Sequence, residues 1–177
     1  MPLIPVVNRL QVGRHYPSLL ACRSLFSTGT ATKDRLYAML YPVIRKTRFD
    51  RIGIWIYGIA SGKVRLGIYN CDDELYPSTL AVDVGERDNV SALGEITIDQ
   101  TLDKGNYFLA FILDASNDLF LEATVYQTPI RHVALLTHYA GYFKTMTYGA
   151  LPSTYPSEAS LEPWLYAVSL RMLEHLT

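Results

Sequence analysis

The sequence predicts an all-β protein: an antiparallel, jelly-roll-like β-sandwich with an extended N-terminal arm. Three observations support this fold class. Apolar residues recur mostly with period two, which is the period of a β-strand. Turn-forming residues separate these runs at short intervals, as in a chain of antiparallel strands. No regular alternation of strands and helices is visible along the 177 residues, which disfavours a parallel α/β sheet.

The first 18 residues are expected to form the extended arm, and residues 19–177 a single sandwich domain. Pro2, Pro5 and Pro17 lie among apolar residues in this stretch, and proline favours an extended backbone. An arm with apolar side chains needs a surface on which to lie. The residues predicted to dock the arm are Leu3, Ile4, Val6, Val7, Arg9 and Leu10.

Two strongly apolar runs are expected to be central strands or strands that face another subunit. Residues 51–59 and residues 105–113 both carry apolar side chains on the two faces of the predicted strand. In the first run the two faces are Ile52, Ile54 and Ile56 against Trp55, Tyr57 and Ile59. Residues 35–44 form another strand, in which Pro42 indicates an edge or a bulge because proline donates no ladder hydrogen bond.

Three half-buried strands are predicted in the middle of the chain, each with apolar residues at alternate positions. Their apolar residues are Val64, Leu66 and Ile68; Leu80, Val82 and Val84; and Ile96, Ile98 and Leu102. Turns are predicted at residues 70–73, 76–78 and 85–89, where Asn, Asp, Pro and Gly are concentrated. A further strand is predicted at residues 119–126.

Residues 138–156 are expected to be a long surface loop, because they combine aromatic residues with glycine and proline. The C-terminal run that follows has two interpretations. Helical spacings of three or four join Leu161, Leu165, Val168, Met172 and Leu176. Strand alternation over residues 165–172 sets Tyr166, Val168, Leu170 and Met172 on one face. Periodicity alone does not decide between the two.

Composition excludes several classes of protein. The 16 basic and 17 acidic residues give a net charge of -1, which argues against nonspecific binding to nucleic acid. A hydrophobic content of 49% excludes intrinsic disorder, and no apolar run is long enough to predict a membrane span. With only 19% charged residues, the chain is expected to cover part of its surface with partner subunits.

A search for catalytic and metal-binding motifs finds no nucleophile elbow, phosphate loop, dinucleotide fingerprint or zinc-protease helix. The four histidines are scattered, and Cys22 and Cys71 form no zinc-ligand pattern. Both cysteines are expected to be reduced, because a free cysteine behaves as a small buried hydrophobe. The carboxylates of residues 72–74 suit either a hard cation or a polar hairpin turn, and the turn is favoured. We expect no catalytic residue, no metal and no cofactor.

Aromatic residues supply the other functional signal, because tyrosine and tryptophan can stack on sugar rings or anchor an interface. Trp55 and Tyr57 lie within an apolar strand, so packing in the core or against a subunit is favoured for these two. For the tyrosines of the predicted loop both interpretations stay open. The candidate residues for glycan binding or subunit contact are Trp55, Tyr57, Asp72, Asp73, Tyr76, Tyr142, Tyr148 and Tyr155.

Several short segments, each with the pattern of a strand or a turn, follow one another along the chain. They are residues 48–54 (RFDRIGI), 64–69 (VRLGIY), 76–80 (YPSTL), 82–85 (VDVG), 94–98 (GEITI) with Leu102, 105–110 (GNYFLA) and 149–156 (GALPSTYP). Together they resemble a β-sandwich module that is common in tailed-bacteriophage virion proteins and prophage regions. The module ends on a strand near an arginine, here Arg171, so the resemblance favours the strand for residues 165–172. The turn at residues 72–76 departs from the module in lacking a glycine.

The resemblance implies a jelly-roll domain of tail fibres, neck or tail appendages, or head decorations, often oligomeric and without catalytic residues. We therefore expect a non-enzymatic structural protein of the virion, made in the host bacterial cytoplasm. We expect it to assemble as a homo-oligomer, specifically a trimer, to contact other virion proteins and to dock through its arm. The alternative function is a carbohydrate-binding module that recognises polysaccharide on the host surface during adsorption.

Overall fold

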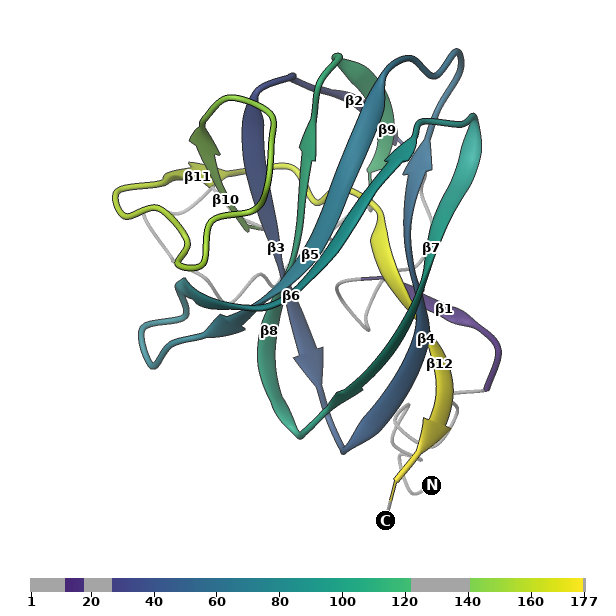
Figure 1. The fold of residues 1–177 in the computed structure, drawn as a ribbon, viewed down its shortest axis with the longest axis vertical. Coiled ribbons are helices and arrows are strands. Elements are labelled where there is room, and N and C mark those ends of the chain that lie inside the picture. Colours follow the sequence, from purple (N-terminus) through teal and green to yellow (C-terminus); the bar gives the residue numbers. More distant parts are fainter. Residues whose placement is uncertain (1–11, 18–26, 122–140, 177) are drawn as a thin grey trace, which may run out of the picture.

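The computed structural model describes residues 12–17, 27–121 and 141–176. The regular elements in these ranges are twelve β-strands (Figure 1). They are β1 (His15–Pro17), β2 (Ser27–Ala31), β3 (Arg35–Val43), β4 (Thr47–Ile56), β5 (Lys63–Cys71), β6 (Pro77–Asp88), β7 (Ala92–Leu102), β8 (Gly105–Leu113), β9 (Asn117–Leu121), β10 (Gly141–Thr145), β11 (Ser160–Glu162) and β12 (Val168–His175). Within these ranges no helix is long and apolar enough to cross a membrane.

Two antiparallel sheets form a sandwich-like fold, and one of them curls into a half-barrel (Figure 1). The first sheet has the order β1-β12-β4-β9-β2, with β7 paired to β4 as well, and the second has the order β11-β10-β3-β8-β5-β6. Strands β2 to β9 alone give the orders β2-β9-β4-β7 and β3-β8-β5-β6. This distribution of eight strands over two sheets is that of a jelly roll. The predicted all-β, jelly-roll-like sandwich is confirmed.

Strands β9 and β12 lie one after the other along the same side of β4. Strand β12 pairs with β4 as far as Ile54, and β9 takes over at Ile56, which is opposite Leu119. One strand further out, β1 pairs with β12 and β2 pairs with β9. Two strands, β9 and β12, therefore share the place beside β4 that one strand fills in a jelly roll, and the chain between them leaves this sheet and returns to it. Its described part adds β10 and β11 to the second sheet.

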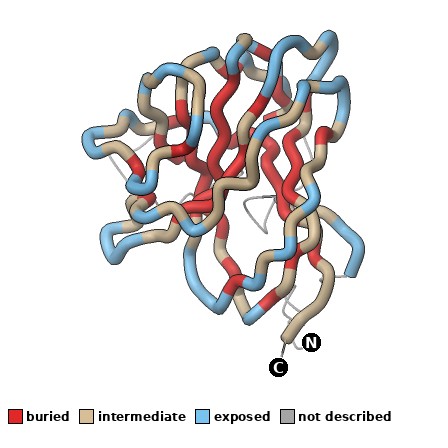
Figure 2. The backbone as a smooth tube through the Cα atoms, in the orientation of Figure 1, coloured by how far each residue is buried: buried red, intermediate tan, exposed pale blue. Residues whose placement is uncertain are grey.

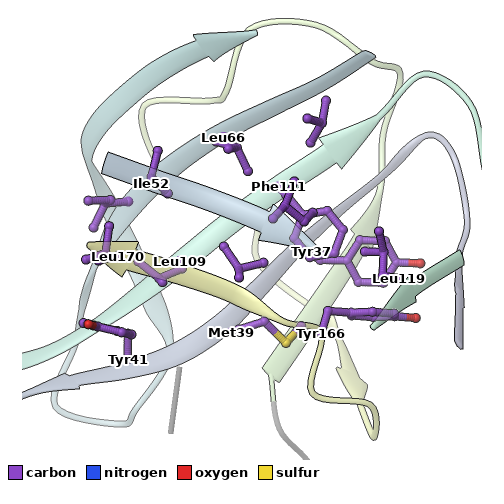
Figure 3. Close-up of a cluster of buried hydrophobic side chains, with 14 of the residues drawn as sticks. Tyr37, Met39, Tyr41, Ile52, Leu66, Leu109, Phe111, Leu119, Tyr166 and Leu170 are labelled. Carbon is purple, nitrogen blue, oxygen red and sulfur yellow. The ribbon is translucent and has the colours of Figure 1, made fainter. Parts of the chain in front are cut away.

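The central strands of the second sheet, β3, β8 and β5, are largely buried (Figure 2), and both faces of this sheet carry clusters of buried apolar side chains. Its inner face packs against the first sheet, with Leu109 and Phe111 of β8 in the shared core (Figure 3). Its outer face carries Phe108 and Ile112 of the same strand and is covered by residues 146–159, which we call the cover segment. Successive residues of β8 point alternately into these two clusters, which explains why the run is apolar on both faces.

The cover segment comes closest to the sheet at Gly67 of β5. A Cβ atom at this position would lie 2.3 Å from Cδ1 of Leu151 and 2.8 Å from the carbonyl oxygen of Val82. Both distances are far below van der Waals contact. The absence of a side chain at Gly67 therefore lets Leu151 pack against the strand.

Most of the predicted strands are confirmed, and the C-terminal run is a strand, β12. The turn predicted at residues 85–89 is wrong, because β6 continues to Asp88. Gly85 has a φ angle of 93° and lies at a register shift in the pairing of β5 with β6. The glycine therefore marks a β-bulge, which needs the left-handed backbone conformation, rather than the end of a strand.

Two further expectations are corrected in part. Residues 141–145 of the predicted surface loop are strand β10, and the cover segment that follows lies over the second sheet. Strand β3 is an interior strand, but its pairing with β10 ends at Met39. Pro42 therefore lies where only β8 forms a ladder with β3, so the predicted edge exists locally. Of the strand predicted at residues 119–126, the described part ends at Leu121.

Replacing Asp50 by asparagine should lower the urea midpoint at about pH 7 and change it much less at about pH 3. Arg171 donates two hydrogen bonds to Asp50, at 2.9 and 2.7 Å, and these bonds hold the pKa of Asp50 below its ordinary value of 3.8. The unfolded chain therefore takes up the proton first on acidification. The ion pair contributes about 1 kcal/mol to the free energy of unfolding, as expected of a partly exposed bidentate pair. This contribution is present above the ordinary pKa of Asp50 and is lost as the pH falls through the lowered pKa of the folded chain.

Asp103→Asn is the matched control for this prediction. Asp103 forms an ion pair with Lys46 at 3.1 Å, but their side chains are 77% and 49% exposed, so solvent screens the attraction. The control should leave the urea midpoint nearly unchanged at both pH values. An equal loss of stability in Asp50→Asn at both pH values would contradict the assigned role of the ion pair.

Candidate functional site

Three of the predicted binding residues meet in an aromatic cluster on the outer face of the second sheet. The ring centroids of Tyr76 and Tyr142 are 4.7 Å apart, and those of Tyr76 and Tyr155 are 6.0 Å apart. Each of the three hydroxyls donates a hydrogen bond to a backbone carbonyl. The acceptors are Pro156 for Tyr76 (2.6 Å), Leu75 for Tyr142 (3.2 Å) and Leu36 for Tyr155 (2.8 Å). The cluster joins the β5–β6 turn, β10 and the cover segment.

The expectation that Tyr142 and Tyr155 are exposed loop residues is wrong. Tyr142 is 8% exposed and Tyr155 is 3% exposed. Burial raises the pKa of Tyr155 well above its ordinary value, so its hydroxyl stays protonated and acts as a donor. In this arrangement neither ring presents a free face on which a sugar could stack. Both tyrosines anchor strand β10 and the cover segment to the sheet.

Asp72 and Asp73 lie in the turn between β5 and β6. The Oδ1 atom of Asp72 accepts hydrogen bonds from the backbone amides of Glu74 (3.0 Å) and Tyr76 (2.8 Å), which is the local bonding expected of an aspartate in a turn. Leu75 adopts a positive φ of 59° where the resemblance led us to expect a glycine. Among the described residues, no group of three or more His, Cys, Asp or Glu side chains could hold a metal ion.

Cys71 borders the same turn. Burial and the neighbouring charges of Asp72 and Asp73 raise the pKa of its thiol to about 11. The thiol is therefore protonated at neutral pH, and Sγ donates to the carbonyl oxygen of Asp72 at 3.3 Å. Cys71 is a free thiol in this structure, in agreement with the prediction of reduced cysteines, whereas Cys22 lies outside the described residues.

Tyr148 also belongs to the cover segment and fixes it to β6. Its hydroxyl lies 3.1 Å from Oε2 of Glu86, and its backbone amide donates to Oδ1 of Asp34 at 3.0 Å. Lys63 binds the other oxygen of Glu86 at 2.8 Å. The lysine and the tyrosine lower the pKa of Glu86. Tyr148 therefore secures the cover segment rather than standing free at the surface.

The two remaining candidates, Trp55 and Tyr57, lie on the other sheet. Trp55 is half-buried on the outer face of β4. Tyr57 follows the end of β4, is 52% exposed, and packs edge-on against Phe120 with their centroids 5.3 Å apart. Trp55 and Tyr57 are therefore separate from the other four aromatic candidates, which lie with the second sheet.

Tyr57 lies at one end of the jelly roll together with two more exposed apolar residues. Ile59 in the β4–β5 turn is 96% exposed, and Val90 in the β6–β7 turn is 39% exposed. We call Tyr57, Ile59 and Val90 the apical patch. Among the described residues only Val12 and Trp164 are further large apolar side chains with this degree of exposure. The turns that carry the patch lie at the end opposite the C-terminal end of β12 (Figure 1).

Hydrogen bonds between neighbouring turns hold the apical patch in place. The side chain of Asn117 accepts from the amide of Ser61 and donates to its carbonyl oxygen, both at 2.9 Å. Asn89 donates to the same carbonyl at 2.7 Å, and Ser91 donates to the carbonyl of Gly58. These bonds join the β4–β5, β6–β7 and β8–β9 turns. The exposed apolar side chains are therefore displayed on a cross-linked scaffold.

Acidic side chains border the apical patch. Asp88, Asp114 and Asp118 are exposed at the ends of the strands that form these turns. Of the lysines in the same region, Lys63 is paired with Glu86, while Lys33 lies in the β2–β3 turn beside Ser116. The patch therefore combines exposed apolar surface with a surplus of carboxylates.

A chain of polar side chains that no sequence pattern indicated crosses the outer face of the first sheet. Nδ1 of His15 lies 3.0 Å from Oγ of Ser169, and Nε2 of His15 lies 2.5 Å from Oε1 of Glu95. These residues come from β1, β12 and β7. His15 lies over Gly53 of β4, where a Cβ atom would be 3.4 Å from Cε1 of the histidine. The residues are far apart in the sequence, so no local motif could indicate them.

The order serine, histidine, glutamate invites comparison with a hydrolase relay. A nucleophilic serine has to meet its substrate, and Ser169 is 1% exposed. His15 covers it and also connects β1 to the sheet. The described geometry therefore fits a structural role, in which the imidazole satisfies the buried serine hydroxyl and fixes β1 to β12 and β7.

A shallow hollow lies between the sheets at the end opposite the apical patch. Its walls include Tyr41, Phe49 and Met172, and no charged side chain lines it. Its ionisable side chains are Tyr16 and Tyr41, and no carboxylate or imidazole lines it.

The predicted arm residues Leu3, Ile4, Val6, Val7, Arg9 and Leu10 lie outside the described residues, whereas residues 15–17 of the arm form β1. The segments that resemble phage virion modules fall mainly within strands β4 to β8 and within the cover segment. Comparison of the sequence with protein-family models and with curated proteins gives no match.

Proposed function

We propose that this chain is a non-enzymatic structural protein of a tailed-phage virion, a capsid decoration or a tail or neck appendage, and that it assembles as a homo-oligomer. The observation that carries the proposal is the apical patch, where exposed apolar side chains are held on hydrogen-bonded turns at one end of a jelly roll. Clustered, rigidly held apolar residues are typical of protein–protein contacts. The phage context comes from the segments that resemble virion modules.

The non-enzymatic part of the proposal is supported by the chemistry of the described residues. The serine of the Ser169–His15–Glu95 chain is buried. The carboxylate of Asp72 is occupied by its own turn. The alternative, a carbohydrate-binding module, loses support because Tyr142 and Tyr155 are buried.

Particles assembled in cells that carry the genome encoding this chain should contain the chain at a fixed copy number, as measured by quantitative mass spectrometry of purified particles. Serine substitutions at Leu3, Ile4, Val6 and Val7 should abolish incorporation, because they remove the apolar side chains that we propose dock the arm.

Trp164→Ser is the matched control, because this residue is 54% exposed and lies outside both the arm and the apical patch. It should be incorporated normally. Absence of the wild-type chain from the particles would contradict the proposed function. Saturable binding on a glycan array that is lost in Tyr57→Ala would favour the carbohydrate-binding alternative.

A further inference from the structure

We propose that the apical patch of one copy receives residues 1–11 of a second copy, so that the chain associates head to tail. This inference rests on the homo-oligomer of the proposed function and names the surface that accepts the arm. Three observations carry it: the direction in which the described chain leads toward its N-terminus, the chemistry of the two surfaces, and the rigidity of the patch.

The first observation is the direction of β1. Toward the N-terminus, the partner of β1 changes from Ser169 to Arg171 of β12. Along β12 this is the direction toward His175, which pairs with Thr47 at the start of β4. The apical turn follows the other end of β4. From Pro17 to His15 the chain therefore leads away from its own apical patch.

Dimensions favour a second copy as the source of the arm. Strand β4 has 10 residues and is about 33 Å long at the usual rise of a strand. Eleven extended residues reach about 36–40 Å, so the arm would have to reverse and run the full length of the strand to meet its own patch. A second copy that lies at the end opposite the apical patch of the first copy presents its own patch directly to the arm.

The second observation is chemical complementarity. Residues 1–11 contain Leu3, Ile4, Val6, Val7 and Leu10 as apolar side chains, and Arg9 is their one charged side chain. The apical patch is apolar and is bordered by exposed aspartates. An apolar, basic segment therefore matches an apolar, acidic surface. Two apical patches facing one another would instead bring like charges together.

The third observation is the hydrogen-bonded scaffold beneath the patch. Because Asn117, Asn89 and Ser91 join the turns, little conformational freedom of the acceptor remains to be lost on binding. Pro2 and Pro5 of residues 1–11 limit the number of conformations that this segment has to lose on binding. A head-to-tail contact of this kind closes into a ring, such as a trimer, or continues as a filament.

A mixing experiment with two full-length variants tests this arrangement. The tip variant carries Ile59→Asp, and the arm variant carries Ile4→Asp and Val6→Asp. In sedimentation velocity, each variant alone should associate about tenfold or more weakly than the wild type, because a charge replaces an apolar contact. An equimolar mixture should form a heterodimer, because the intact arm of the tip variant meets the intact patch of the arm variant.

The matched control is Trp164→Asp, which introduces the same charge at an exposed apolar residue outside the patch and should associate as the wild type does. A charge reversal adds a second test. Arg9→Glu and Asp88→Lys should each weaken association, and the double variant should recover most of the loss. Circular dichroism should give the same spectrum for every variant.

The outcomes separate this inference from the proposed function. Loss of association in the arm variant with full association in the tip variant would overturn the apical patch as acceptor, while the homo-oligomer would stand. Loss in the tip variant alone would overturn the arm as the occupant of the patch. A mixture that remains monomeric would overturn the head-to-tail arrangement. A wild-type chain that is monomeric at all concentrations would overturn both the inference and the homo-oligomer, but not the presence of the chain in particles.

Discussion

Replacing Tyr155 by alanine should lower the free energy of unfolding by about 3–5 kcal/mol, the usual cost of removing a large buried aromatic ring. Tyr155 is almost fully buried in the outer cluster of the second sheet. Its ring lies 5.3 Å from the ring of Tyr69, and its hydroxyl donates to the carbonyl of Leu36 at 2.8 Å. The substitution therefore opens a cavity between the cover segment and β3. Urea denaturation followed by circular dichroism measures the loss.

Tyr155→Phe is the control that separates packing from hydrogen bonding. It keeps the ring and removes only the donor to Leu36, so it should cost about 1 kcal/mol. Should Tyr155→Ala cost no more than Tyr155→Phe, the ring would contribute nothing, and the cover segment would not be anchored to the sheet as described.

The burial of the cover segment could be predicted from the sequence only in part. The predicted strand at residues 105–113 is apolar on both faces, and a strand of this kind needs apolar partners on two sides. This requirement is met by the cover segment, with Leu151 and Tyr155. The turn-rich composition of residues 138–156 concealed this role, because glycine, proline and tyrosine are common both in exposed loops and in segments that pack on a sheet.

The strands themselves could be predicted well, because period-two alternation is a local property of the sequence. Gly85 was misleading, since a glycine that ends a strand and a glycine that forms a bulge look alike without the partner strand. The apical patch was visible only as Tyr57 and Ile59 on one face of an apolar run. Their exposure depends on where β4 ends, and Val90 joins them only through the meeting of two turns.

Replacing Tyr166 by alanine should also lower the free energy of unfolding by about 3–5 kcal/mol. Tyr166 lies two residues before the start of β12, where the chain returns to the side of β4 after β11. Its ring packs edge-on against Tyr37 and Phe111 of the inner core, at centroid distances of 5.1 and 5.6 Å (Figure 3). The substitution therefore removes the side chain that anchors the segment before β12 in the core between the two sheets. The loss is measured by urea denaturation.

The matching phenylalanine variants should differ between the two sites. The hydroxyl of Tyr166 is 3.4 Å from the carbonyl of Thr30, longer than an ordinary hydrogen bond between oxygens, so Tyr166→Phe should cost less than Tyr155→Phe. Because the two rings belong to different clusters on opposite faces of the second sheet, the losses in Tyr155→Phe and Tyr166→Ala should add in the double variant. A loss that departs from the sum by more than about 0.5 kcal/mol would mean that the cover segment and the inner core stabilise one another through the sheet between them.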